Sequence, residues 1–403
     1  MSDAIIIIGG GHAAAQLCAA LVDAGQGERT HLICEEAAHP YQRPPLSKGF
    51  LKNRDESLQL HRDPDWYTLH KVQVHLRDAA VGIDASQRNV RLASGEELTY
   101  SKLVLATGTL ARTLPWLDRP LDNVLSLRHV ADAQAMRERL QREGGGSLTV
   151  LGGGFIGLEV ASSAKHLGWD VRVIEVAPRL LQRSTSPELS AYVLEHHRQM
   201  GTRVDLGALI GEPEIRGERL AYLHVDGEPL AIDEMLLGIG AMPEVGLART
   251  AGLQIDNGIC VDAAMVTSDP DILAIGDCTS FDYQGRRIRL ESVQNANDQA
   301  KIAAATLLGR AASYRPTPHF WSDQGGAKLQ MAGLWHPQLS AVRRPGAAPA
   351  SFSLFHYEGS HLIAVESVNA PVDQMWSRKL LERGISPTPD QASDPAFALK
   401  TLM

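Results

Sequence analysis

Two glycine-rich turns are the residues best suited to bind phosphate in this chain. They share one pattern and are Gly9-x-Gly11-x-x-Ala14 and Gly152-x-Gly154-x-x-Gly157. In this pattern the first glycine makes a tight turn, the second lets a pyrophosphate approach the backbone, and the third small residue lets a helix pack closely on a strand. The pyrophosphate then lies at the helix N-terminus, where N–H groups and the helix dipole favour negative charge. The chain therefore carries the signature of two dinucleotide sites.

An acidic residue follows each turn at the distance expected for ribose binding. Glu35 ends the apolar run after the first turn, and Glu175 ends the run after the second. A carboxylate at this place hydrogen-bonds ribose hydroxyls. The alternative is that both residues are ordinary surface acids, but this would require the same coincidence at two equivalent positions. Because a carboxylate repels a 2′-phosphate, Glu175 predicts NADH rather than NADPH at the second site.

The elements that must position these residues repeat along the chain. Each turn lies between a buried strand and a helix, and a second strand follows. The predicted strand, helix and strand are 4–8, 13–24 and 30–36 in the first unit, and 148–151, 156–166 and 170–175 in the second. The repeat distance of about 143 residues indicates a duplicated unit rather than a short-period solenoid.

Other segments complete two parallel sheets and a third part. We expect strands at 103–106, 228–240 and 271–277 and a helix at 293–308. From about residue 316 the pattern changes to short antiparallel strands followed by a helix, and the turn-rich segment 384–395 is expected to be a surface linker. The predicted fold class is α/β, with two Rossmann-like dinucleotide-binding domains and an α+β C-terminal domain.

Composition excludes several classes of partner. The chain has 403 residues and a formal net charge of −8, from 39 Lys and Arg against 47 Asp and Glu. This acidity argues against nucleic acid as a bulk partner. Its four cysteines have no metal or disulfide-motif spacing and are expected to be reduced and mostly buried. No signal peptide and no apolar run of about 18 residues are seen, so we expect a cytoplasmic protein without a membrane span or a metal.

Six motifs resemble one protein family over nearly the whole chain. They are "YQRPPLSK" (41–48), "LVLATG" (103–108), "GGGFIGLEVA" (152–161), "TSDPDILAIGDC" (267–278), "ESVQNANDQA" (291–300) and "FWSDQ" (320–324). The chain resembles the two-dinucleotide-domain flavoprotein reductases, and among them the NADH-dependent ferredoxin reductases of bacterial oxygenase systems. The resemblance implies a glutathione-reductase-like architecture with FAD and NAD(H) as cofactors. It implies an FAD domain at 1–110 and 243–315, an NAD domain at 111–242 and a C-terminal domain at 316–403.

The resemblance also implies roles for individual residues. Those expected to contact FAD are Gly9, Gly11, Ala14, Glu35, Arg43, Lys48, Ala106, Thr107, Gly108, Asp277, Val293 and Trp321. Those expected to contact NAD are Gly152, Gly154, Ile156, Gly157, Glu159, Glu175 and Gly240. Lys48 and Glu159 are expected to pair as the catalytic residues. Simpler alternatives are a surface lysine for Lys48, a helix-dipole partner for Glu159 and a core aromatic for Trp321.

The route by which electrons leave is constrained by what the sequence lacks. Residues 37–60 contain no cysteine, so no protein dithiol can follow the first unit there. A separate [2Fe–2S] ferredoxin, of Rieske or adrenodoxin type, is the expected acceptor, and an oxygenase is expected beyond it. Rubredoxin, oxygen, and an NADH-sensing role like that of apoptosis-inducing factor are the alternatives. The oligomeric state stays open between monomer and homodimer.

A basic loop is the candidate docking surface for an acidic ferredoxin. Arg286, Arg287 and Arg289 lie just before the helix predicted at 293–308, and Arg343 with Arg344 is a second candidate. The alternative for either group is a solvated charged loop.

Overall fold

The contacts within the chain divide it into two compact units. The structure is a computed structural model that describes residues 3–403. The first unit comprises residues up to 43, 57–110 and 241–316, and the second comprises 44–56, 111–240 and 317–403. Segment 44–56, which the predicted boundaries assign to the FAD domain, thus belongs to the second unit. The division into three domains stays a prediction.

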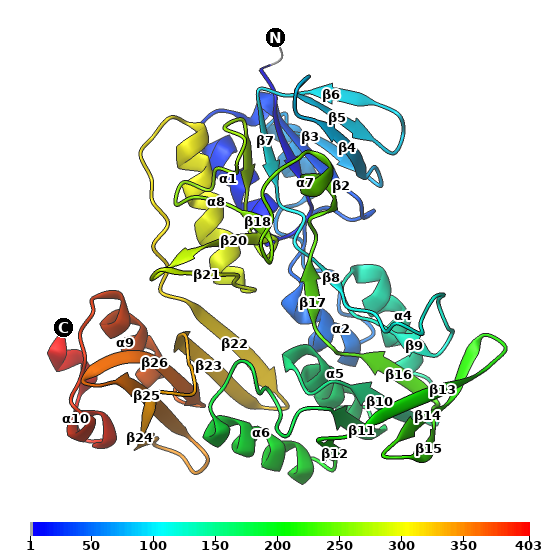
Figure 1. Cartoon of the computed structure of the whole chain (residues 1–403), viewed down its shortest axis with the longest axis vertical. Helices are drawn as coiled ribbons and strands as arrows, with labels where there is room; N and C mark the ends of the chain where they lie inside the picture. The colour runs from blue at the N-terminus through cyan, green and yellow to red at the C-terminus, as the bar shows by residue number, and fades with distance from the viewer. Residues whose placement is uncertain (1–2) are drawn as a thin grey trace. The chain divides into compact units, whose positions relative to one another are not determined.

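The first unit is built on a five-stranded parallel sheet (Figure 1). In spatial order its strands are β19 (Ile272–Ala274), β7 (Lys102–Leu105), β1 (Ile5–Ile8), β2 (Thr30–Cys34) and β3 (Gln73–Leu76). Every residue of β1 is buried, as expected for a central strand with both faces covered. Helix α1 (His12–Asp23) packs beside α8 (Val293–Leu307), as Figure 1 shows.

Smaller elements surround this sheet. The helices are α3 (Pro64–Leu69) and α7 (Gly246–Thr250). One antiparallel sheet consists of β4 (Ala80–Asp84), β5 (Asn89–Leu92) and β6 (Glu97–Thr99), and another small sheet of β18 (Ile259–Cys260), β20 (Thr279–Tyr283) and β21 (Arg286–Ile288). The chain leaves this unit through β8 (Thr109–Ala111) and returns through β17 (Ala241–Pro243).

The second unit repeats the same design. Its parallel strands, in spatial order, are β12 (Arg203–Leu206), β11 (Asp170–Glu175), β10 (Ser147–Leu151), β16 (Glu234–Leu237) and β9 (Val124–Leu125). Its helices are α2 (Gly49–Lys52), α4 (Val130–Leu140), α5 (Phe155–His166) and α6 (Pro187–Gln199), and an antiparallel sheet is formed by β13 (Ile210–Arg216), β14 (Arg219–Val225) and β15 (Glu228–Ala231). The predicted strand–helix–strand order of both units is therefore confirmed.

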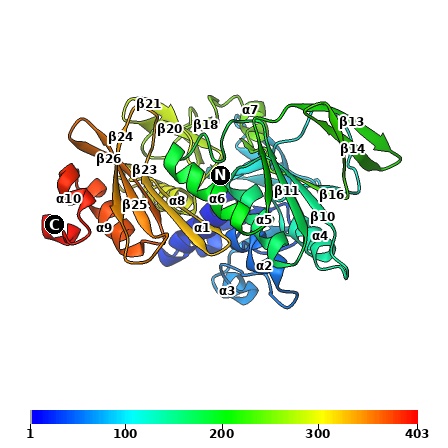
Figure 2. The same cartoon turned by 90° about the horizontal axis from the view of Figure 1, so that it is seen from below.

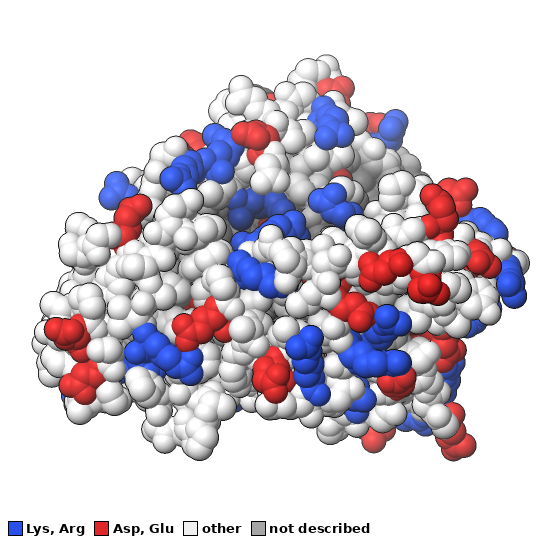
Figure 3. All heavy atoms as spheres, turned by 60° about the horizontal axis from the view of Figure 1, so that its bottom comes forward, with Lys and Arg blue, Asp and Glu red and all other residues white. Residues whose placement is uncertain are grey.

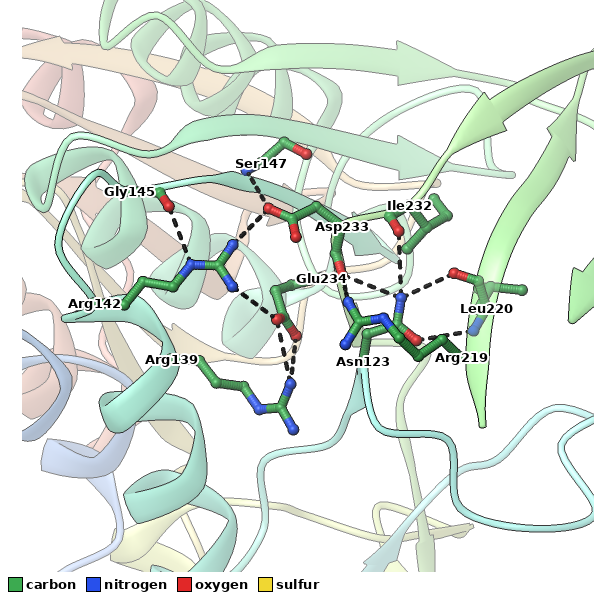
Figure 4. Close-up of polar contacts among 10 residues, drawn as sticks. All are labelled: Asn123, Arg139, Arg142, Gly145, Ser147, Arg219, Leu220, Ile232, Asp233 and Glu234. Atoms are coloured by element: carbon green, nitrogen blue, oxygen red, sulfur yellow. Dashed lines mark hydrogen bonds and ion pairs between the residues drawn. The ribbon is translucent and has the colours of Figure 1, made fainter. Parts of the chain in front are cut away.

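A buried ion-pair network fixes the start of β16 (Figure 4). Glu234 is almost fully buried and accepts hydrogen bonds from Arg139 at 2.9 Å and Arg142 at 3.3 Å. Arg142 also donates to Asp233 at 2.6 Å. Burial raises the pKa of Glu234 even though Arg139, Arg142 and Arg219 oppose that change. The network ties α4 to the sheet that carries the second glycine turn.

The C-terminal part of the second unit is an antiparallel sheet with helices against it. Its strands, in spatial order, are β22 (His319–Gln324), β23 (Ala327–Gly333), β26 (His361–Val368), β25 (Phe352–Glu358) and β24 (Ser340–Pro345). Helix α9 (Pro371–Glu382) packs against β23 and β26 and lies beside this sheet in Figure 2. The change of pattern after residue 316 predicts this sheet and helix correctly.

The expectation of a surface linker at 384–395 is wrong. This segment contains helix α10 (Pro389–Ser393), whose N-terminus is closed by a capping box between Thr388 and Gln391. The buried Arg344 guanidinium donates to the carbonyl groups of Ala392, Asp394 and Phe397. The segment is therefore packed onto the C-terminal sheet, with Thr388 as the N-cap of α10 and Pro389 in its first turn.

Candidate functional site

The first glycine turn has the backbone geometry of a phosphate-binding turn. Gly9 has φ +131°, and a Cβ atom there would lie 2.2 Å from the Ala106 carbonyl oxygen. Gly11 is the N-cap of α1, where no side chain caps the helix and the first turn holds no acid. A pyrophosphate at this N-terminus would therefore meet neither a competing carboxylate nor a capping side chain. The buried Ala14 supplies the close contact between helix and sheet.

An ion pair lies beside this turn and was missed by the sequence analysis. The Arg43 guanidinium donates to Glu36 at 2.9 Å, and the Tyr41 hydroxyl donates to the same carboxylate at 2.6 Å. A Cβ atom on Gly11 would lie 4.0 Å from Arg43 Nε, so the guanidinium lies next to the turn. Glu35, in contrast, is exposed. Glu35 and Glu36 are consecutive in the sequence, and nothing in the sequence indicates which of the two pairs with Arg43.

The other predicted FAD residues of the first unit follow neighbouring strands. Ala106 follows β7 and donates its N–H to Ile8 at 2.8 Å. Thr107 donates its hydroxyl to the Glu244 carbonyl at 2.7 Å, and Gly108 has a positive φ. These residues therefore gather with the glycine turn at the carboxyl ends of β1 and β7, where ligands bind in open α/β sheets.

Asp277 and Val293 are tied together by a buried glutamine. Asp277 follows β19, and Val293 is the first residue of α8 after its N-cap, Ser292. Gln299, on α8, accepts the Gly276 N–H at 2.7 Å and is fully buried. The structure thus holds the turn at Asp277 against α8.

The second glycine turn repeats the geometry of the first. Gly152 has φ +108°, and a Cβ atom there would lie 2.4 Å from the Gly238 carbonyl oxygen. A Cβ atom on Gly157 would lie 2.6 Å from the Gly152 carbonyl oxygen, so only glycine allows this packing. Gly154 caps α5 without a side chain, and its first turn holds no acid.

Glu175 reaches this turn through two backbone hydrogen bonds. Its Oε2 accepts the Gly153 N–H at 2.6 Å and its Oε1 accepts the Ala177 N–H at 2.7 Å. Two large apolar side chains near it stay exposed, Ile156 at 48% and Val176 at 62%. Gly240, with φ +105°, follows β16 on the other side of the turn. Exposed apolar groups beside a fixed carboxylate are suited to contact a bound nucleotide. Ile156 was among the residues expected to contact NAD, whereas Val176 was not.

Lys48 and Glu159 form an ion pair within the second unit. Lys48 Nζ lies 2.5 Å from Glu159 Oε2, and the Glu159 side chain is 3% exposed. The ion pair joins the two residues that the resemblance pairs, and their catalytic roles stay a prediction. Ser47 and Ser322 also donate to Glu159, each at 2.5 Å. Neither serine was predicted, because a serine has no sequence signal of its own.

Trp321 is not a core aromatic. Its side chain is 41% exposed on β22, although its chain neighbours Phe320 and Ser322 are partly buried and buried, respectively. An exposed indole on an otherwise packed strand fits a planar ligand.

The structure separates the five candidate docking arginines. Arg286, Arg287 and Arg343 are exposed, and Arg287 donates a hydrogen bond to the Ser280 carbonyl at 3.0 Å. Arg289 is only 13% exposed and donates to the Asp277 carbonyl at 3.4 Å, so it does not lie on the surface with them. Arg344 is buried and ties down 391–397, which excludes it as a docking residue. On the face drawn in Figure 3, basic and acidic side chains are interspersed.

Neither the cysteines nor the described acidic and histidine residues indicate another redox centre. Cys18, Cys34 and Cys278 are buried, no disulfide joins the four thiols, and burial raises the pKa of Cys18 and of Cys34 to about 12. The expectation that the cysteines are mostly buried is confirmed. Among residues 3–403 no group of His, Cys, Asp and Glu side chains could hold a metal ion, and no helix is long and apolar enough to cross a bilayer.

One pocket lies away from these residues. It has a volume of about 550 Å³ at the β12 edge of the second parallel sheet and is lined by Arg172, Arg198 and Arg203. None of the predicted cofactor residues lines it. The glycine turns, rather than this pocket, therefore define the candidate cofactor sites.

Two parallel sheets, each with a glycine turn and an uncapped helix N-terminus, define a protein of the class that binds two dinucleotides. Residues 3–300 match the family model for pyridine nucleotide-disulphide oxidoreductases, and 319–403 match that for the reductase C-terminal domain. The chain belongs to the pyridine nucleotide-disulphide oxidoreductase family.

Relatives and a solved structure match nearly the full chain. Rhodocoxin reductase of Rhodococcus erythropolis is 38% identical over 98% of this chain and 93% of its own. The ferredoxin–NAD(+) reductase component of the anthranilate 1,2-dioxygenase system of Burkholderia cepacia is 38% identical over the whole of both chains. The ferredoxin reductase for the CYP199A2 system of Rhodopseudomonas palustris is 41% identical, with a TM-score of 0.93 over 99% of each chain. This likeness confirms the predicted fold class.

Proposed function

We propose that this protein is an FAD-dependent NADH:ferredoxin reductase that supplies electrons to an oxygenase. One observation carries the proposal. The chain belongs to a disulphide-oxidoreductase family and has both glycine turns of that family, but residues 37–60 contain no cysteine. Three of its four thiols are buried, and burial raises the pKa of Cys18 and of Cys34, so these two are poorly suited to accept electrons as a dithiol. The relatives reported above are named as reductases of small redox proteins, which supports a ferredoxin as the acceptor.

FAD is proposed to bind the first unit and NADH the second. The N-terminus of α1 at Gly11 would hold the FAD pyrophosphate, and Arg43 beside it would add positive charge. The N-terminus of α5 at Gly154 would hold the pyrophosphate of NADH, while Glu175 accepts hydrogen bonds from its adenosine ribose. The proposed domains stay 1–110 with 243–315 for FAD, 111–242 for NADH and 316–403 at the C-terminus.

Lys48, Glu159 and Trp321 are the proposed residues of the reaction. FAD, when bound, supplies the chemistry that takes a hydride from NADH and releases electrons singly. Lys48 donates to Glu159, to the Pro44 carbonyl at 3.1 Å and to the Ser47 hydroxyl at 3.2 Å, so its ammonium group is fixed. A fixed charge orients a substrate without reorganising during the reaction. The exposed Trp321 indole excludes water from a planar ligand.

The proposed docking surface for ferredoxin consists of Arg286 and Arg287. Both follow β20 on the short hairpin strand β21, and neither is buried. Ferredoxins are usually acidic, so charge complementarity would steer their encounter with this hairpin.

A visible spectrum with and without electron acceptors tests the function. We expect a yellow protein whose flavin absorbance is bleached by NADH, slow oxygen consumption, and fast turnover only when a [2Fe–2S] ferredoxin is added. Faster turnover with rubredoxin than with ferredoxin would show that rubredoxin, rather than ferredoxin, is the electron acceptor. Rapid oxygen consumption without any carrier would indicate an NADH oxidase. Reduction by NADH without turnover on any carrier would favour an NADH-sensing protein.

A further inference from the structure

The Glu159 carboxylate is held by three donors from two distant segments of the second unit. Its Oε2 accepts hydrogen bonds from the Ser47 hydroxyl and the Lys48 ammonium group, each at 2.5 Å. Its Oε1 accepts a hydrogen bond from the Ser322 hydroxyl, also at 2.5 Å. Ser47 and Ser322 are each 2% exposed, so no solvent competes for these contacts. Both oxygens of the carboxylate are therefore fixed by the protein itself.

The direction of the Ser322 hydrogen bond is set by its neighbour. Gln324 Nε2 lies 2.7 Å from Ser322 Oγ and 3.4 Å from the Phe155 carbonyl oxygen. A carbonyl oxygen only accepts, so the side-chain nitrogen of Gln324 must face it and must donate to Ser322. The Ser322 oxygen thus accepts from Gln324, and its single proton is left for Glu159.

A buried histidine holds Gln324 in this orientation. His197 Nε2 lies 3.1 Å from Gln324 Oε1, and both side chains are fully buried. Because an amide oxygen accepts, His197 donates from Nε2. A series of hydrogen bonds therefore leads from His197 on α6, through Gln324 and Ser322 on β22, to Glu159 on α5.

We propose that Ser322 is a positioning residue for hydride transfer, which it serves by orienting the Glu159 carboxylate and, through it, the Lys48 ammonium group. This inference rests on the proposed function, in which Lys48 and Glu159 are the residues of the reaction. Without Ser322 the carboxylate loses the donor on Oε1 and turns fully toward Lys48. More of the lysine charge is then neutralised by the carboxylate and less of it acts on the bound flavin.

The test compares Ser322→Ala with two matched variants. Ser162→Ala is the control, because Ser162 is also a buried serine of the second unit but its hydroxyl has no hydrogen-bond partner in the protein. Ser322→Thr is the conservative variant, because threonine keeps the hydroxyl and suits a strand. Thermal unfolding of all three flavin-loaded proteins verifies that they are folded.

Two readouts separate positioning from a general structural role. Rapid-mixing experiments with NADH give its Kd and the limiting rate of flavin reduction, and dye equilibration gives the midpoint potential of the bound flavin. For Ser322→Ala we expect a limiting rate lower by roughly tenfold, the scale of one lost hydrogen bond to a charged group. We expect an unchanged Kd and a more negative midpoint potential, because a cation near the flavin favours its reduced, more negative form. Ser322→Thr should restore both values.

The outcomes distinguish this inference from the function on which it rests. If Ser322→Ala matches Ser162→Ala in limiting rate and midpoint potential while the wild-type protein still reduces ferredoxin, only the role of Ser322 is overturned. The same conclusion follows if Ser322→Ala changes the Kd of NADH alone. If NADH does not reduce the wild-type flavin, the proposed function fails and the role of Ser322 fails with it.

Discussion

At the scale of single residues, Glu175 shows how backbone N–H groups can fix a carboxylate. Its two oxygens accept the N–H groups of Gly153 and Ala177, so the side chain is fixed beside the second glycine turn. The sequence predicts this acid from its distance to the turn. It does not predict Ser322, whose role depends on a strand more than 160 residues from Glu159.

Replacing Glu175 by Ala should weaken NAD⁺ binding by roughly tenfold, since one hydrogen-bonded charged contact is lost. Binding of NADP⁺ should stay the same or improve, because the repulsion of a 2′-phosphate is removed. Isothermal titration with the oxidised nucleotides measures both affinities without electron transfer. Glu228→Ala, an exposed acid on β15, is the control. Equal losses for both nucleotides would exclude the proposed ribose contact.

At the scale of elements, buried polar residues tie together strands and helices that are distant in sequence. His197 on α6 contacts Gln324 on β22, and Arg344 on β24 binds the carbonyl groups around α10. The period of apolar residues predicts each of these elements separately. It contains no information on which polar side chain of one element will face another, because that depends on how the elements pack.

Acidification should destabilise the protein through His197. Burial lowers the pKa of His197 to about 4 from 6.5, so between these values the unfolded chain takes up a proton that the folded chain does not. The free energy of unfolding should therefore fall as the pH drops below 6.5, by up to about 3 kcal/mol at pH 4.

Urea unfolding between pH 4 and 7.5 checks this, with the wild-type protein compared with His197→Gln. The difference between their unfolding free energies should shrink as the pH falls, because the variant has no titrating group at this position. His166→Gln, an exposed histidine at the end of α5, is the control and should follow the wild-type protein at every pH. A difference that does not vary with pH would contradict the prediction.

Arg344 should stabilise the C-terminal segment, and its neighbour Arg343 should not. Arg344→Met leaves Asp373 and several carbonyl groups unpaired in a buried place, which should cost about 3 kcal/mol or more. Arg343 is about half exposed, so Arg343→Met should cost less than about 1 kcal/mol. Denaturant unfolding gives both values, and proteolysis should cut near α10 only in the Arg344 variant. Similar losses for both variants would contradict the assigned role of Arg344.

At the scale of the whole molecule, a mildly acidic chain can still recognise an acidic partner through a small basic surface. The proposed docking residues Arg286 and Arg287 are exposed on one hairpin, although the net charge is −8. Long-range attraction between exposed charges is screened by salt, which makes the proposal measurable.

Reversing both charges, Arg286→Glu with Arg287→Glu, should raise the KM for ferredoxin by about tenfold at low salt and less at high salt. The rate of flavin reduction by NADH should not change. The control reverses Arg203 and Arg216, which are exposed on the second unit and give the same net charge. Steady-state kinetics over a range of ferredoxin and salt concentrations measure the effect. If the control raises KM equally, net charge rather than docking at this hairpin is responsible.

The sequence by itself determined the two strand–helix–strand units, the glycine turns and the family. These depend on local properties: glycine is favoured where φ is positive and required where a Cβ would clash, and apolar runs are required where a strand is buried on both faces. Only the tertiary structure decided that Glu36 rather than Glu35 pairs with Arg43, that Arg344 is buried, and that Ser322 donates a hydrogen bond to Glu159. Those contacts join side chains from distant segments, and a polar side chain finds its partner only after the elements around it have packed.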